Sequence, residues 1–283
     1  MPSSSLYAVL RRWLSLLHVY LLGCVYSLRE LFWREIDFIQ SKVPDSAVAV
    51  VTGGSGGIGL SLVRFLLARG FRVIVLAKNQ ESLELKSVEL EFIKLDLSSL
   101  ASTVETARLL KGTAQNQSVG EQRRNYVSAV QLDGGWLKQL LEVGAETDSL
   151  GRIVNISSCT LHAGQLSFEQ FGRAFQNSYT AYANSKLAIA AFTQVLQKKL
   201  IVEGSKVEVV ALHPGVIPTD LYAKAPQPFR ALITEFPGPL LMRTTEDAAR
   251  SVINVALATS LLSGRYYEYG SVVKLSVSTK DIE

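Results

Sequence analysis

The sequence predicts an α/β protein with a doubly wound, mostly parallel sheet that carries helices on both faces. Short β-branched runs alternate with segments of helical periodicity, and a glycine-rich turn joins the first run to the first helix. A chain of 283 residues has the length of one such domain with a short appendage. We expect an N-terminal hydrophobic segment and linker over residues 1–43 and the domain over residues 44–283.

The composition excludes several classes of protein. Apolar residues make up 48% of the chain and charged residues 19%, which excludes a disordered or collagen-like chain. The net charge is +4 without a long run of Lys or Arg, so no nucleic-acid partner is expected. Cys24 and Cys159 do not indicate a disulfide framework, and the three scattered histidines predict no metal site.

An uncharged stretch near the amino terminus, Trp13–Leu28, is a candidate membrane anchor. It is shorter than the roughly 20 residues that usually cross a bilayer. We favour a spanning or re-entrant anchor helix, and three alternatives stay open: an in-plane amphipathic helix, a cleaved signal peptide, and a helix packed on the domain's own core. We therefore expect a membrane as a partner.

A nucleotide-binding unit is predicted after the linker. The buried strand Ala47–Val51 runs into the turn TGGSGGIG at Thr52–Gly59, a helical pattern follows, and Phe71–Leu76 is the next strand. Glycine allows the turn to be tight and lets the helix N-terminus face the phosphates of a ligand. Strand, glycine turn, helix and strand in this order are the context of a dinucleotide-binding loop.

The end of the second strand bears on the choice of cofactor. NAD(H) is usually held by an acidic residue about twenty positions after the glycines, but this chain has Ala77, Lys78 and Asn79 there. Because a lysine can pair with a 2′-phosphate, we favour NADP(H) over NAD(H). The alternative is that Lys78 is a solvated loop lysine.

A group of polar residues suited to proton transfer follows the predicted strand Gly151–Ile156. Ser158 comes directly after this strand, and Tyr182 and Lys186 share one face of a later helix because they are four residues apart. A neighbouring ammonium lowers the pKa of a phenol, which is otherwise near 10, toward the range that acid–base catalysis needs. Ser157 is interpreted as a strand-end serine that satisfies backbone groups.

The strand Val207–Leu212 leads into the segment HPGVIPTD. Pro214 and Gly215 form a rigid turn at which the chain can approach a nicotinamide. His213 is interpreted as structural because Tyr182 already fills the role of proton donor and acceptor.

The glycine spacing TGxxxGxG, followed in order by Asp96, Ser158, Tyr182 with Lys186, and a PGxxxT segment, resembles the short-chain dehydrogenase/reductase family over residues 48–274. The resemblance implies a Rossmann-type fold and a catalytic group of Ser158, Tyr182, Lys186 and Asn125. The residues that it implies for cofactor binding are Thr52, Gly53, Ser55, Gly57, Ile58, Gly59, Lys78, Asp96, Leu97, Tyr182, Lys186, Pro214, Gly215 and Thr219.

Within the family, the chain looks most like the membrane-bound, retinol-dehydrogenase-like members. The hydrophobic leader, the AYANSKLA context of Tyr182 and the long stretch between Ser158 and Tyr182 carry this resemblance. It implies a lipophilic alcohol (retinoid, steroid or isoprenoid) and its aldehyde or ketone as substrates. It also implies the endoplasmic reticulum membrane, with the lipid droplet as an alternative, and a homodimer of the kind that the family often forms.

The family's fourth strand normally ends in Asn-Asn-Ala-Gly, and this motif is absent between Asp96 and Arg152. If Asn125 begins the family's central helix, the strand is missing. The sheet is then incomplete and the chain is an inactive variant that cannot seat the cofactor, since backbone groups are left unpaired. If Tyr126–Leu132 is itself the strand, 133–135 is a turn, 136–143 is a short helix, and Asn125 is not catalytic.

Overall fold

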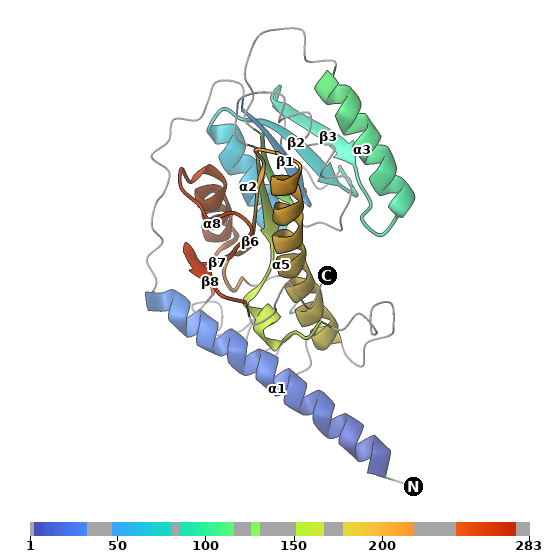
Figure 1. Cartoon of the computed structure of the whole chain (residues 1–283), viewed down its shortest axis with the longest axis vertical. Coiled ribbons are helices and arrows are strands. Elements are labelled where there is room, and N and C mark those ends of the chain that lie inside the picture. Colours follow the sequence, from blue (N-terminus) through green and yellow to red (C-terminus); the bar gives the residue numbers. More distant parts are fainter. Residues whose placement is uncertain are drawn as a thin grey trace.

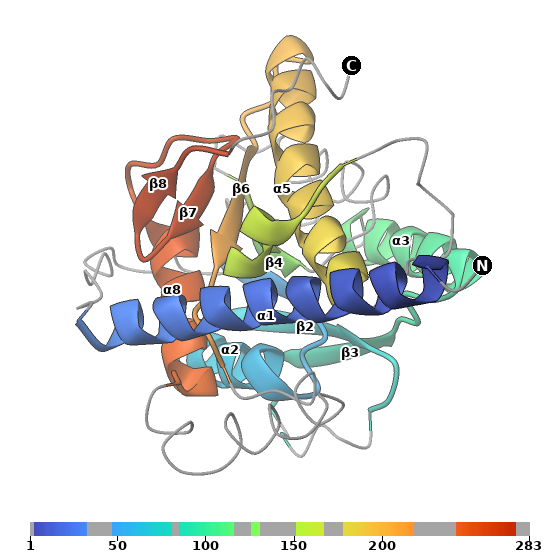
Figure 2. The same ribbon diagram turned by 90° about the horizontal axis from the view of Figure 1, so that it is seen from below.

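A computed structural model describes residues 3–32, 47–80, 85, 87–115, 126–130, 151–166, 178–217 and 242–275. Figure 1 shows a central sheet between two layers of helices, and a long N-terminal helix that crosses one end of the sheet. The view from below in Figure 2 shows this helix, α1, running across the whole width of that end.

The described elements are strands and helices interspersed along the chain, as the sequence predicts. In chain order they are α1 (Ser3–Phe32), β1 (Val48–Thr52), α2 (Gly57–Ala68), β2 (Arg72–Ala77), β3 (Leu90–Lys94), α3 (Leu100–Gln115), β4 (Tyr126–Val130), β5 (Arg152–Ile156), the 3-10 helix η1 (Cys159–Ala163), α5 (Ser178–Val202), β6 (Glu208–His213), α8 (Thr245–Leu257), β7 (Tyr266–Glu268) and β8 (Ser271–Val273).

The sheet is doubly wound. Its strand order is β3-β2-β1-β4-β5-β6-β7-β8, and every neighbouring pair is parallel except β7 with β8. The order runs outward in one direction from β1 to β3 and in the other from β4 onward. In sheets of this kind ligands bind beyond the carboxyl ends of the strands, at the point where the order reverses. That point lies between β1 and β4.

The strand β4 decides between the two alternatives for the fourth strand. Tyr126–Ala129 pair in register with Val48–Val51 of β1, and Val127–Val130 pair with Arg152–Asn155 of β5. The sheet is therefore continuous through its centre, and the expectation of an incomplete sheet is wrong. The predicted turn at 133–135 and helix at 136–143 lie outside the described residues.

Both faces of the sheet are buried, which explains the continuous apolar runs in the strands. Ala49 and Val51 of β1 point to the side covered by α2 and α8, and Val48 and Val50 point to the side covered by α3 and α5. A buried strand of this kind carries apolar residues at every position rather than at alternate ones.

The described part of the carboxyl-terminal end closes the sheet with a hairpin. Two short strands, β7 and β8, form a hairpin in which Glu268 pairs with Ser271. Tyr269 and Gly270 have φ values of 52° and 73°, as a two-residue type I′ turn requires. The capping of α8 agrees with the sequence, because Thr244 and Asp247 form a reciprocal capping box at its start.

The N-terminal segment is a helix whose last turns pack on the domain. Tyr26 and Glu30 are buried against residues from the ends of β6 and β7. Among the residues that the structure describes, no helix is long and apolar enough to cross a membrane. The spanning anchor that the sequence favoured is thus not found in this part of the chain.

A buried arginine, Arg152 on β5, fastens the end of α8 to the sheet. Its Nη1 atom donates to the backbone oxygens of Val255, Ala256 and Ala258 at 3.1, 3.0 and 2.7 Å, and its guanidinium is paired with Glu208. Carbonyls at the end of a helix have no partner within the helix, so a cation there satisfies them and complements the helix dipole. The Arg152 side chain is only 3% exposed.

We expect Arg152→Met to lower the free energy of unfolding by about 3 kcal/mol, because it leaves buried carbonyls and a carboxylate without their donor. The matched control is Arg72→Met, which breaks the half-exposed Arg72–Glu91 pair and should cost less than about 1 kcal/mol. Urea unfolding followed by circular dichroism measures both. Equal losses for the two variants would contradict the role assigned to Arg152.

Candidate active site

The glycine turn after β1 folds as the sequence predicts. The N–H of Gly53 donates to the oxygen of Leu76 at 2.7 Å, and Gly53 and Gly57 have positive φ values of 67° and 51°. A Cβ added at Gly59 would lie 2.3 Å from the backbone oxygen of Gly53. Glycine is therefore needed at position 59 for close contact and at 53 and 57 for conformation.

The amino end of α2 is open to a ligand. Its N-cap residue, Gly56, makes no side-chain capping bond, and Gly53, Gly56 and Gly57 are exposed. Uncapped N–H groups at a helix start, with the positive end of the helix dipole, form a natural site for phosphate. The remaining predicted residues of this loop, Thr52, Ser55 and Ile58, lie between these glycines or beside them.

Lys78 and Asp96 follow neighbouring strands and form an ion pair. The Lys78 Nζ lies 3.0 Å from an Asp96 carboxylate oxygen, and the Lys78 side chain is 67% exposed. Hydrogen bonds from Ser98 and the contact with Lys78 lower the pKa of Asp96 to about 2. Leu97, the next residue, is exposed on the same edge. Lys78 is thus exposed to solvent at the sheet edge but already paired with an anion.

The predicted catalytic residues Ser158, Tyr182 and Lys186 are brought together. Ser158 precedes η1 at the end of β5, and its side chain forms a hydrogen bond with the hydroxyl of Tyr182 on α5. The Lys186 Nζ lies 5.4 Å from the centre of the Tyr182 ring and donates to the oxygen of Ile156 at 3.1 Å. Two neighbouring hydroxyls, of Ser158 and Tyr182, with the buried amine of Lys186 close to the Tyr182 ring are an arrangement suited to proton transfer.

Burial dominates the electrostatics of this group. It raises the pKa of Tyr182 above its ordinary value, and the hydrogen bond with Ser158 acts in the opposite direction. Burial also lowers the pKa of Lys186 to about 8. The pKa of Tyr182 therefore lies above its ordinary value rather than below it as expected, because burial, together with the nearby Cys159, outweighs the hydrogen bond with Ser158.

Ser157 and His213 are structural, as the sequence analysis proposed. The Ser157 hydroxyl donates to the backbone oxygen of Lys186 at 2.8 Å, so it connects β5 to α5. His213 ends β6 and is buried, with its Nε2 atom 3.5 Å from the carboxylate of Glu30. Burial alone would lower the pKa of His213, but Cys159 and Glu30 raise it to about 10.

The turn after β6 lies beside this group. Pro214 and Gly215 are buried, and Gly215 has a φ of 114°, which favours glycine. Two predicted residues, Asn125 and Thr219, lie outside the described residues. Tyr126, next to Asn125, begins a strand, and this is the alternative under which Asn125 was not expected to be catalytic. Within the described ranges, no group of His, Cys, Asp and Glu could hold a metal ion.

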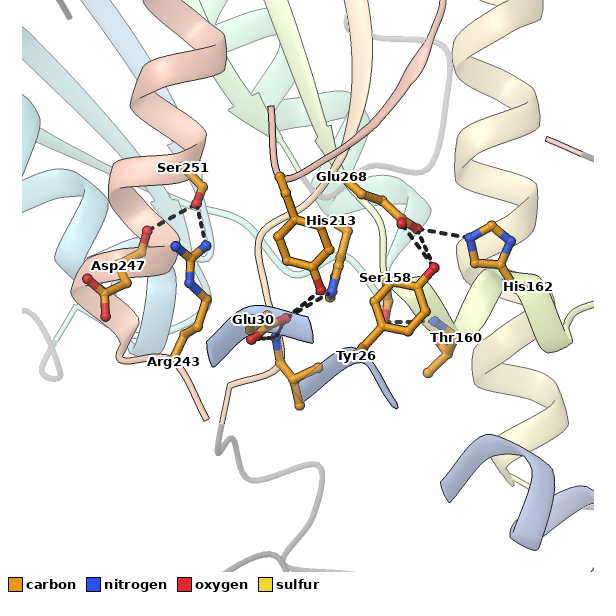
Figure 3. Close-up of polar contacts among 12 residues, drawn as sticks. Tyr26, Glu30, Ser158, Thr160, His162, His213, Arg243, Asp247, Ser251 and Glu268 are labelled. Atoms are coloured by element: carbon orange, nitrogen blue, oxygen red, sulfur yellow. Dashed lines mark hydrogen bonds and ion pairs between the residues drawn. The ribbon is translucent and has the colours of Figure 1, made fainter. Parts of the chain in front are cut away.

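Sequence reasoning missed a polar cluster contributed by the N-terminal helix. Figure 3 shows Tyr26 and Glu30 of α1 facing residues from η1, β6 and β7. The Tyr26 hydroxyl donates to Glu268 at 2.9 Å, and the ring of Tyr26 stacks on His162 at 6.1 Å. The available signal was the spacing of Tyr26 and Glu30, which puts an acid and a phenol on one face of an apolar helix.

Comparison with known proteins gives the family. A model of the short chain dehydrogenase family matches residues 47–118 and 122–228, which is more than half of the chain. The chain is 29% identical over 300 residues to a polyprenol dehydrogenase of Danio rerio, covering 95% of this chain and 92% of that protein. It is 30% identical over 260 residues to retinol dehydrogenase 13 of Mus musculus, covering 81% and 77%.

Solved structures agree with the fold. A short chain dehydrogenase from Shigella flexneri superposes with a TM-score of 0.54 at 20% identity, covering 87% of this chain and 98% of that one. An actinorhodin polyketide ketoreductase solved with NADPH gives 0.54 at 21% identity, covering 81% and 97%. Together with the glycine turn and the Ser158–Tyr182–Lys186 group, the family match shows that the chain belongs to the short-chain dehydrogenase family of oxidoreductases.

Proposed function

We propose that this protein interconverts a lipophilic alcohol and its aldehyde or ketone with NADP(H), at a membrane. The observation that carries the proposal is the contact of Tyr182 with Ser158 above Lys186. This group lies beyond the carboxyl end of β5, on the same edge of the sheet as the glycine turn that follows β1.

The residues present fit a dinucleotide. The exposed backbone of Gly53, Gly56 and Gly57 offers a place for the pyrophosphate, because no side chain caps the start of α2. Asp96 and Leu97 lie at the edge that would hold the adenosine half, and Pro214 and Gly215 lie beside the catalytic group at the other half. When bound, the cofactor supplies or accepts the hydride.

The chain's own residues would handle the proton. In carbonyl reduction, the Tyr182 hydroxyl gives its proton to the carbonyl oxygen, and in alcohol oxidation the phenolate takes the hydroxyl proton. The Ser158 hydroxyl donates a hydrogen bond to the same oxygen and so orients the substrate. A raised pKa keeps Tyr182 protonated at neutral pH, which is the form that reduction uses.

Relatives support the substrate class. Similar proteins are polyprenol dehydrogenases and retinol dehydrogenases, which favours isoprenoid, retinoid or steroid alcohols and their carbonyl partners for this chain. From the family resemblance we propose the endoplasmic reticulum membrane, or lipid droplets, as the location of the protein; substrates of this kind partition into lipid. A homodimer is proposed from the family resemblance.

We expect Gly59→Ala to abolish cofactor binding, because its Cβ would overlap the backbone of Gly53 and distort the turn. Gly23→Ala is the matched control, since nothing lies within 4 Å of a Cβ there and the residue is in α1, outside the glycine turn; its affinity should change less than about threefold. Quenching of intrinsic fluorescence on adding NADPH measures both, with circular dichroism to verify folding. Normal binding by a folded Gly59→Ala protein would contradict the proposed cofactor seat.

Lys78→Ala should weaken NADPH binding roughly tenfold and leave NADH binding almost unchanged, because only the 2′-phosphate pairs with this ammonium. Lys199→Ala removes an exposed lysine from the far end of α5 and should change neither affinity. The same fluorescence titration with both nucleotides provides the readout. Equal weakening for NADH and NADPH would exclude Lys78 as the basis for preferring NADP(H).

Tyr182→Phe should lower turnover of retinal or a polyprenal by at least about a thousandfold, because the variant has no proton to give. Its NADPH affinity should stay within about threefold of the wild type, since the ring and Lys186 are retained. Steady-state NADPH oxidation and nucleotide titration separate the two effects. Turnover that survives the substitution would remove Tyr182 from the mechanism.

A further inference from the structure

The turn that ends β6 is held by a carboxylate from the N-terminal helix. The N–H of Val216 donates to both oxygens of Glu30, at 2.8 and 3.1 Å, although the two residues are 186 positions apart in the chain. The Glu30 carboxylate also lies 3.5 Å from the Nε2 atom of His213, and Figure 3 shows these two side chains next to each other. Glu30 therefore contacts the residue before the turn of Pro214 and Gly215 and the residue after it.

This turn depends on partners outside its own segment. Gly215 has a φ of 114°, and a glycine backbone is free to adopt many other conformations. The plane of the peptide between Gly215 and Val216 is therefore set by what its polar groups bind. Its N–H is bound by Glu30. Because the C=O and N–H of a trans peptide point in opposite directions, the same contact fixes where the Gly215 oxygen points.

A second contact holds the turn from the segment that precedes α8. The N–H of Arg243 donates to the backbone oxygen of Val216 at 2.9 Å. A Cβ added at Gly215 would lie 2.5 Å from the Cδ atom of Arg243, so the arginine side chain packs directly on the glycine. The turn is thus fixed between two segments that are far from it in sequence, and α1 is one of them.

A buried carboxylate is a costly way to fasten a helix. The Glu30 side chain is 2% exposed, and the loss of hydration on burying a charge can exceed what its partners return. Apolar contacts already fasten α1, because Leu22 and Tyr26 pack in one cluster with Val216 and Tyr269. Where a buried charge adds little stability, it can still select one conformation of the groups that it contacts. For Glu30 that group is the turn.

The turn lies next to the group proposed for catalysis. Strands β5 and β6 are parallel neighbours, and Ile156 pairs with Leu212 in their register. Ser158 and Pro214 each follow this pair by two residues, so they leave the same edge of the sheet side by side. A contact that fixes the turn therefore fixes the border of the site beside the serine that would orient the substrate.

We propose that Glu30 is a positioning residue for the proposed reaction. It fixes the turn between His213 and Val216, and this turn seats the nicotinamide half of the cofactor beside Ser158. The N-terminal helix thereby completes the active site. The inference rests on the proposed function, since it concerns the cofactor of that reaction. Glu30 acts through the backbone of the turn and touches neither substrate nor cofactor.

Nucleotide binding to the full chain tests the proposal without any turnover. NADPH contains both halves of the cofactor, whereas adenosine 2′,5′-bisphosphate contains only the adenosine half. Glu30→Leu leaves the Val216 N–H without its acceptor, so NADPH affinity should fall about tenfold. Affinity for the bisphosphate should stay within about twofold of the wild type, because the adenosine half would lie at the distant edge near Asp96. Titration calorimetry measures both affinities.

Tyr26→Phe is the matched control. It removes another polar contact of α1, the hydroxyl bond to Glu268 at 2.9 Å, and keeps the ring that stacks on His162. Because this change loosens the helix and not the turn, both affinities should stay within about twofold of the wild type. Glu30→Gln keeps an acceptor oxygen in the same place and should retain most of the NADPH affinity.

Circular dichroism verifies that each variant folds. If Glu30→Leu does not fold, Glu30→Asp carries the same expectation, because its carboxylate is one methylene short of the Val216 N–H. Unchanged NADPH affinity in the folded variant would overturn the proposal. Equal losses for NADPH and the bisphosphate, or a loss that Tyr26→Phe reproduces, would also overturn it, since Glu30 would then only hold the fold together. Wild-type protein that binds neither nucleotide would contradict the proposed function itself, and this inference with it.

Discussion

One geometric constraint organises the molecule, which is that parallel strands all end at the same edge of the sheet. The glycine turn follows β1, Ser158 follows β5 and Gly215 follows β6, so residues far apart in sequence meet along one line. The chain reverses its direction of winding between β1 and β4, and the turn and the catalytic group lie on either side of this point. The α1 helix crosses the same edge, which is why its side chains reach His213 and Glu268.

The sequence predicted those features that depend on local pattern. The strand–turn–helix unit at 47–68 follows from a β-branched run and glycines, and the pairing of Tyr182 with Lys186 follows from a spacing of four on a helix. The structural role of Ser157 was also predictable, because a strand-end serine has backbone groups within reach. Asn125 and Thr219 lie outside the described residues, so their roles stay predictions.

Features that depend on tertiary contacts could not be predicted from the sequence. Lys78 pairs with Asp96 because β2 and β3 are neighbours in the sheet. The distance between the two residues along the chain does not predict this ion pair. The direction of the Tyr182 pKa follows from how deeply α5 is buried, which a helical spacing cannot give. The sequence allowed two predictions for the segment that forms β4. A short segment with Val and Tyr suits a strand, whereas the family pattern favours a helix at the same place, and the structure has the strand.

The two hydrogen bonds between β5 and α5 run in opposite directions, from Ser157 to the oxygen of Lys186 and from Lys186 to the oxygen of Ile156. They close a small ring that ties strand to helix at the level of the reacting hydroxyl. Side chains locked in this way have already lost their rotational freedom during folding, so little of it is left to lose when substrate arrives. In the proposed reaction, the scaffold would therefore carry part of the entropic cost of ordering the site, and more of the binding energy would remain for the lipophilic substrate that we propose.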